Sequence, residues 1–202
     1  YSSEKEEHEA LTGANAFEKT VQGIKNALAA GLNVSVNTPL CKINKDYAKT
    51  LQFLHELGVE YVSCSGIIYT GNARNEDAKK QQLSEHELFR VLAEATAYCK
   101  DNNMEISFTS PGQLSRDKLD CIGLAVPTCG ACLSNMAIAP NGDVVPCCLD
   151  NEGKLALGNI FKSKISDILN SPRAQNIYKG FTERNTPEEF CKTCTYANKF
   201  LG

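Results

Sequence analysis

The sequence contains no apolar run that approaches the roughly 20 residues needed to span a membrane as a helix. It also lacks a basic cluster, because Lys and Arg are scattered through a chain with a net charge of -3. That distribution offers no surface for nucleic acid or an anionic membrane. The first seven residues are too polar for a secretory signal peptide, and the three histidines do not cluster. We therefore expect a soluble, cytoplasmic protein with neither a nucleic-acid nor a membrane partner.

Cysteine, in contrast, is abundant and unevenly placed. Of the ten cysteines, seven fall from Cys121 onward, whereas Cys41, Cys64 and Cys99 are isolated. In the reducing cytoplasm, clustered cysteines favour a metal or iron-sulfur site over disulfides. The isolated cysteines and Cys121 are expected to be small buried apolar side chains. Cys148 receives no assignment from the pattern.

The first half repeats a unit of one helix and one strand. Apolar residues recur at helical spacing over three segments, 17–28, 47–57 and 88–98. Each is followed by a short apolar strand, at 32–36, 59–62 and 104–108. Asn15 is expected to cap the first helix, and Ser84 with Glu87 forms a capping box before the third. This alternation predicts a parallel α/β architecture, either an open sheet or an arc of a (β/α) barrel.

Three such units cannot close an eight-stranded barrel. A partial barrel has exposed sheet edges, which a neighbouring protein, self-association with a second copy or sequence outside this chain would have to cover. Working residues in such folds lie at the carboxyl ends of strands. Here these are Asn37 and Thr38, the segment 64–66, and Thr109 and Ser110, for which ordinary turn chemistry is the alternative.

The second half is organised around a predicted β-hairpin. Residues 136–139 and 144–147 read as two short strands, and Asn141-Gly142 between them supplies the positive φ angles of a tight turn. A hairpin brings the residues before its first strand close to those after its second. The cysteines at these places are Cys129 or Cys132 on one side and Cys147 or Cys148 on the other.

Downstream, Cys191-Lys192-Thr193-Cys194 adds a CxxC pair. Such a pair lets one turn of backbone hold a single metal or cluster, so the cysteines together predict a site with four thiolates. Structural zinc and an iron-sulfur cluster are equally satisfied by four thiolates, and the spacing does not decide between them. Between the hairpin and this pair, helices are expected around residues 165–169 and after Ser171-Pro172.

Four segments resemble a SPASM or twitch domain, the auxiliary cluster module of radical S-adenosylmethionine enzymes: Cys129-Gly130-Ala131, 138–147, 157–160 and 191–194. The first half is similar to the later strands of the partial barrel of these enzymes, with residues 8–13 resembling the segment just past its fourth strand. The resemblance implies an α/β fold, with a partial (β/α) barrel segment at 1–112. A small cysteine-rich α+β domain with a β-hairpin, the SPASM/twitch-like auxiliary cluster domain, follows at 113–202.

By this resemblance, one auxiliary 4Fe-4S cluster is bound by Cys129, Cys147, Cys191 and Cys194, with Cys132 the rival for the first place. Asn37 would face S-adenosylmethionine or substrate at the mouth of the barrel. In the family such clusters serve electron transfer or substrate binding, usually in the modification of a peptide or protein substrate. Zinc could replace the cluster, or the site could be empty, after purification in air.

The sequence departs from the family in two respects. The CxxxCxxC motif that binds the S-adenosylmethionine cluster is absent, so this chain alone is expected to be inactive, and S-adenosylmethionine is expected only in the full-length oxidoreductase. Phe200 also stands where a full SPASM domain carries a further cysteine, so one auxiliary cluster is the most we expect. The alternative is a non-enzymatic module with a structural four-cysteine zinc site.

Overall fold

A computed structural model gives the structure of the chain. It describes the residues in the ranges 1–68, 73, 75–110, 113–127, 131, 135–148, 150 and 153–183. The chain divides into two compact units, Tyr1–Pro127 and Thr128–Gly202. Within the described ranges, no helix is both long and apolar enough to cross a membrane.

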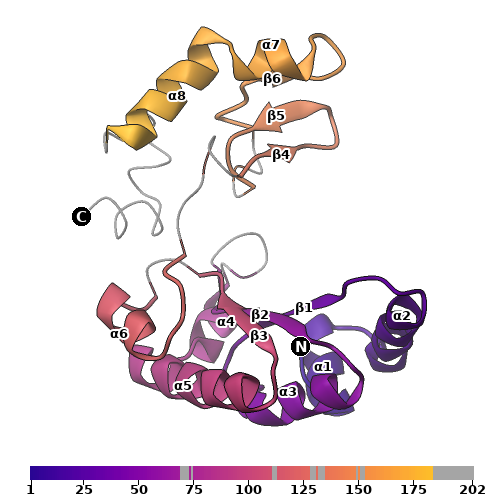
Figure 1. Ribbon diagram of the computed structural model, residues 1–202. Coiled ribbons are helices and arrows are strands. Elements are labelled where there is room, and N and C mark those ends of the chain that lie inside the picture. The colour runs from indigo at the N-terminus through magenta and orange to yellow at the C-terminus, as the bar shows by residue number, and fades with distance from the viewer. Residues whose placement is uncertain are drawn as a thin grey trace. The chain divides into compact units, whose positions relative to one another are not determined.

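The first unit is a parallel sheet with helices. Its strands are β1 (Ser35–Pro39), β2 (Tyr61–Ser65) and β3 (Glu105–Phe108), in the order β1-β2-β3. Its helices are α1 (Lys5–Thr12), α2 (Phe17–Ala29), α3 (Tyr47–Glu56), α4 (Glu76–Gln81), α5 (Glu85–Asp101) and α6 (Arg116–Cys121). Both strand pairs are parallel, and Figure 1 shows α3 and α5 along one face of the sheet. The predicted α/β class is confirmed, and over the described residues the sheet has three strands and does not close into a barrel.

Two helix starts show how far local sequence determines the helix caps. The capping box before α5 is confirmed, with the Ser84 hydroxyl accepting from the Glu87 N–H and the Glu87 carboxylate accepting from the Ser84 N–H. The predicted Asn15 cap of α2 is wrong. This helix has Ala16 at its N-cap with no side-chain hydrogen bond, and its first backbone bond runs from Thr20 N to Ala16 O. Phe17, the first residue of the helix, packs its ring against His8 and stacks on Phe53.

Strand β1 lies later in the chain than the sequence predicts. The expected strand at 32–36 rested on alternating apolar residues, but Leu32 is 60% exposed. The side chains that β1 and its end bury beneath the helices are those of Thr38 and Leu40. Tertiary burial, rather than local alternation, therefore fixes which residues form the strand.

The outer side of β1 carries a proline. Leu40 N donates to Ser65 O at 2.6 Å, so the Leu40 N–H points toward β2. Successive residues of a strand direct their backbone groups to opposite sides. Pro39 therefore sits with its nitrogen on the free side of β1, the position in a sheet where a missing N–H is tolerated.

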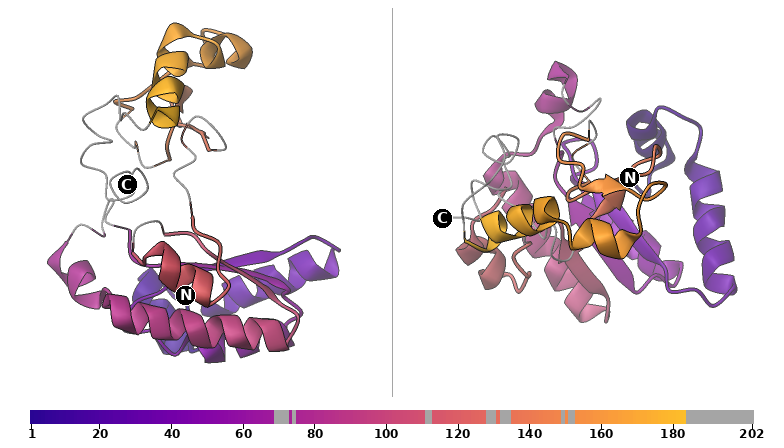
Figure 2. Two further views of the ribbon diagram at one scale, coloured as in Figure 1. Left: turned by 60° about the vertical axis from the view of Figure 1, so that its left-hand side comes forward. Right: turned by 90° about the horizontal axis from the view of Figure 1, so that it is seen from above.

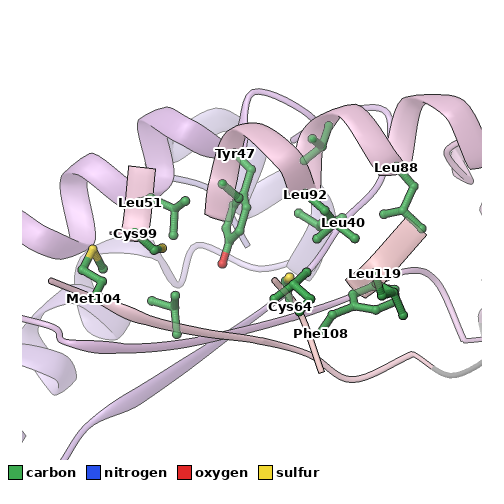
Figure 3. Close-up of a cluster of buried hydrophobic side chains, with 14 of the residues drawn as sticks. Leu40, Tyr47, Leu51, Cys64, Leu88, Leu92, Cys99, Met104, Phe108 and Leu119 are labelled. Carbon is green, nitrogen blue, oxygen red and sulfur yellow. The ribbon is translucent and has the colours of Figure 1, made fainter. Parts of the chain in front are cut away.

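The main core lies between the sheet and the helices α3 and α5. Figure 3 shows side chains from both layers meeting there, with the Tyr47 hydroxyl directed from α3 toward the strands. Leu51 of α3, Leu92 of α5 and Cys64 of β2 are fully buried. Burying a side chain of this size contributes about 1.5–3 kcal/mol each, so this layer supplies much of the stability of the unit.

The first unit extends beyond residue 112, where the family resemblance places the domain boundary. Leu114, Leu119 and Leu124 belong to the same buried cluster as the residues of α3 and α5. Figure 2 shows α6 lying with the other helices of this unit. The segment 113–127 thus packs with the parallel sheet.

The isolated cysteines are buried as the sequence predicts, and Cys121 is not. Cys41, Cys64 and Cys99 are at most 3% exposed. Cys121 is exposed at the last residue of α6, where its Sγ donates to Lys118 O at 3.1 Å. In α6 the inward position is taken by Leu119, which is 1% exposed and leaves Cys121 outside.

These thiols are expected to differ sharply in reactivity. Burial raises the pKa of Cys64 to about 12 and that of Cys99 to about 11. Because the thiolate is the nucleophile, iodoacetamide at pH 8 should alkylate Cys121 and leave Cys64 and Cys99 intact until urea unfolds the chain. Mass spectrometry of digests checks this. Equal labelling of Cys64 and Cys121 in the native chain would contradict it.

The second unit contains a small antiparallel sheet and two helices. The strands are β4 (Ala137–Ile138), β5 (Asp143–Val145) and β6 (Gly158–Asn159), in the order β4-β5-β6. The helices are α7 (Ile165–Leu169) and α8 (Pro172–Thr182), shown in orange to yellow in Figure 1. Its own buried cluster joins Val144, Leu157, Ile168, Ala174 and Ile177. The predicted hairpin is confirmed as β4-β5.

The hairpin turn differs in one detail from the sequence prediction. Among the residues of the turn, Gly142 has positive φ, at 85°, and Asn141 does not. Gly142 N donates to Ala139 O and Ala139 N to Asp143 O, each at 2.8 Å. This is a three-residue loop that ends in a left-handed glycine. A Cβ at Gly142 would lie 2.5 Å from the Phe161 ring, so any other residue here would also displace that ring.

Candidate functional site

The hairpin leads to Cys147, which lies two residues past the end of its second strand. Ala137 pairs with Val145, and the same register carried two residues further sets Asn135 opposite Cys147. Val145 and Pro146 are buried immediately before Cys147, which is half-buried itself. Asn135, three residues after Cys132 in the sequence, therefore lies at the same end of the small sheet as Cys147.

Of the predicted ligands, Cys147 is the one that the structure describes. The other four, Cys129, Cys132, Cys191 and Cys194, lie outside the described residues. In the part of the chain that is described, no three His, Cys, Asp or Glu side chains come together as a metal site. The full ligand set therefore stays a prediction.

The described part of the second unit fits a sulfur-ligated cluster. Cys147 provides a thiol at a point where the backbone is fixed by the hairpin and half-covered by protein. Ala131, between two further predicted ligands, is 2% exposed. Thiolate ligands on partly covered backbone are the donors that iron-sulfur clusters use, and also those of four-cysteine zinc sites.

An amide and carboxylate network holds the hairpin that delivers Cys147. The Asp143 carboxylate accepts from Asn159 Nδ2 at 2.9 Å and from Asn141 Nδ2 at 2.7 Å. The hydrogen bond from Asn159 and, to a smaller extent, that from Asn141 hold the pKa of Asp143 below its usual value. Asn159 Nδ2 also donates to Asn141 O at 2.9 Å, which ties β6 to the turn. Sequence analysis missed this network. The one part with a local signal is the bond from Asp143 N to Asn141 Oδ1 at 3.1 Å, because an Asn in a turn tends to accept from the backbone two residues on.

A buried carboxylate follows Cys147. Asp150 is 4% exposed, and its two carboxylate oxygens accept from Lys154 N at 3.0 Å and from Leu155 N at 2.7 Å. Asp150 N donates to Cys147 O at 3.1 Å. Sequence analysis could not single out this residue, because an Asp in a polar loop is ordinary and its burial depends on the tertiary fold.

In the first unit, Asn37 lies on the face of the sheet that is opposite the core. The parallel register aligns Asn37, Ser63 and Ser107 across the three strands. Asn37 Oδ1 accepts from Ser63 Oγ at 3.0 Å. Their neighbours Thr38 and Cys64 point the other way and are fully buried, so this row forms an uncharged polar surface on the sheet.

Asn37 and Thr38 lie within β1 and not after it, so their predicted place beyond the end of the first strand is wrong. Thr109 and Ser110, which follow β3, form local hydrogen bonds. Thr109 Oγ1 donates to Cys64 O at 3.2 Å, and Ser110 Oγ accepts from Gly66 N at 3.0 Å. Thr38 is buried toward the helices. These groups fasten the loop after β2 to the end of β3, which is the ordinary structural role that the sequence left open.

Comparison with known proteins finds one family match, which lies within the second unit. Residues 129–195 match the family model of SPASM, an iron-sulfur cluster-binding domain. No curated protein matches the chain. Among solved structures, the crystal structure of BtrN in an open conformation aligns with 81% of this chain and 92% of that one, at 18% identity and a TM-score of 0.31.

Proposed function

We propose that this chain, whose residues 129–195 match the SPASM family of iron-sulfur cluster-binding domains, is the C-terminal part of a radical S-adenosylmethionine oxidoreductase. The observation that carries the proposal is Cys147, held half-buried at the end of the hairpin inside the matched segment. The parallel α/β first unit, within which residues 1–112 would be the end of the partial barrel, agrees with this placement.

Four thiolates would hold one 4Fe-4S cluster in the second unit. The ligands we propose are Cys129, Cys147, Cys191 and Cys194, with Cys132 the alternative to the first. Such a cluster takes up and releases single electrons or binds a substrate group directly. The residues of the chain hold the thiol of Cys147 in place through the hairpin and limit its contact with water.

The polar row on the first unit would face the reaction partners of the complete enzyme. Because Ser63 occupies Asn37 Oδ1, the Asn37 NH₂ group is the part able to donate to S-adenosylmethionine or to a peptide or protein substrate. An uncharged row of this kind suits the backbone amides of a peptide. The cytoplasm, where thiols stay reduced, is the compartment in which the cluster would be assembled.

Metal analysis of the chain made without oxygen tests the proposal. We expect about four irons and matching sulfide per chain, with absorbance near roughly 400 nm. One zinc per chain, without iron or visible absorbance after reconstitution with iron and sulfide, would contradict it and favour the structural zinc module.

Reading the gene upstream of residue 1 is a second test, because the parent enzyme requires a CxxxCxxC motif there.

A further inference from the structure

Two side chains bind the backbone of residues 154–156, a short loop that follows Cys147. The Asp150 carboxylate binds the N–H groups of Lys154 and Leu155. From α8, Arg173 Nε donates to Ala156 O at 2.7 Å and a terminal guanidinium nitrogen to Lys154 O at 3.1 Å. Donors and acceptors of the same short loop are thus both satisfied, and Leu155 within it is 2% exposed. This loop is fixed rather than loosely solvated.

The fixed loop acts on Cys147 through its backbone. Asp150 N donates to Cys147 O, and Gly153 N donates to Asp150 O at 3.2 Å. On the other side of Cys147, Val145 is paired with Ala137. The main chain is therefore held both before and after Cys147. After Cys147, the side chain that holds it is that of Asp150.

The Asp150 carboxylate also puts a negative charge near Cys147, because the backbones of the two residues are hydrogen-bonded to each other. This carboxylate is almost fully buried and is stabilised by two charge-assisted hydrogen bonds to backbone amides. Charges inside a protein act more strongly on one another than charges in water. An electron added to a cluster at Cys147 would be repelled by this carboxylate, because the charge and hydrogen bonds around a cluster set its reduction potential.

We infer that Asp150 is a positioning residue of the iron-sulfur site, which holds Cys147 in its ligating position and keeps the reduction potential of the cluster low. This inference rests on the proposed function. It concerns the cluster rather than the substrate, so it applies whether the cluster transfers electrons or binds substrate.

The test is a redox titration of the reconstituted full chain and of two variants. With Asp150→Asn, we expect the reduced-to-oxidised ratio at a fixed potential to rise about tenfold, a shift of about 59 mV for one electron. Iron should also be lost faster to a chelator. Asp150→Glu keeps the negative charge, so we expect a reduction potential close to that of the wild type. Its longer side chain should disturb the hydrogen bonds to Lys154 N and Leu155 N, so we also expect faster iron loss. The matched control is Asp167→Asn, which removes the same charge from an exposed position on α7 and should change neither property.

Each outcome decides the inference. Wild-type potential and iron retention in Asp150→Asn would overturn it, as would equal shifts in Asp150→Asn and Asp167→Asn. If Asp150→Asn holds no cluster, Asp150→Glu carries the test: a potential near the wild-type value supports the charge effect, and a shifted one contradicts it. Failure of the wild-type chain to take up iron would instead refute the proposed function.

Discussion

Replacing Cys147 with serine is expected to remove nearly all iron from the reconstituted chain. A hydroxyl is a far poorer ligand for iron than a thiolate. Loss of a contact that merely supports a ligand costs about 10–100-fold in metal affinity, and loss of the ligand itself should cost at least as much. Iron analysis and the visible spectrum of the variant, reconstituted beside the wild type, measure the effect.

Cys148 and Cys121 provide matched controls for this substitution. Both are exposed, and Cys148 directly follows the proposed ligand. Serine at either position should leave iron content and spectrum unchanged. If Cys147→Ser kept its iron while Cys148→Ser lost it, the ligand assignment would move by one residue. Loss of iron in all three variants would indicate a general effect of thiol removal, against the assignment.

Truncation of Leu51 to alanine is expected to destabilise the first unit by about 2–5 kcal/mol. Leu51 is fully buried between α3 and the sheet, where Figure 3 shows it among the side chains of the main core. Removing its branch forfeits burial and leaves a cavity that close-packed neighbours fill only partly. Urea unfolding followed by circular dichroism measures the change in the free energy of unfolding.

An exposed leucine in the same unit serves as the control. Leu32 is 60% exposed, so Leu32→Ala should change the stability by less than about 0.5 kcal/mol. Iron per folded chain should stay at the wild-type value in both variants, because the buried clusters of the two units share no residue. Equal destabilisation by the two substitutions would contradict the packing described for α3.

Sequence periodicity predicted the α/β class, the parallel sheet and the β4-β5 hairpin, because these depend on patterns within short segments. The capping box at Ser84 has the same local origin. The position of β1 and the start of α2 could not be predicted, because the burial of Thr38 and the packing of Phe17 depend on contacts from elsewhere in the chain. Cys121 was misassigned for the same reason, since Leu119 occupies the inward position.

The sequence predicted which cysteines could form the candidate site, but not the hydrogen bonds that surround Cys147. The spacing of the cysteines and the turn signal at Gly142 indicated where Cys147 would be presented. Nothing in the sequence distinguished Asp150 from an ordinary loop residue, and the family resemblance of segment 157–160 did not indicate what Asn159 binds. Their roles come from hydrogen bonds across the fold, which a linear pattern does not encode.

Pro39 makes the two borders of the parallel sheet unequal. A further strand that aligned along β1 would find no hydrogen-bond donor at Pro39, whereas β3 turns the N–H groups of Ile106 and Phe108 outward, since Glu105 N and Thr109 N are already bonded to β2. Along the described residues, the backbone of β3 thus offers a further strand an N–H group at each outward position, whereas the backbone of β1 lacks one at Pro39. A proline introduced at Ile106 would remove one of these two outward donors of β3 and make the two borders more alike, whereas a charged side chain there would meet the core against which Ile106 packs.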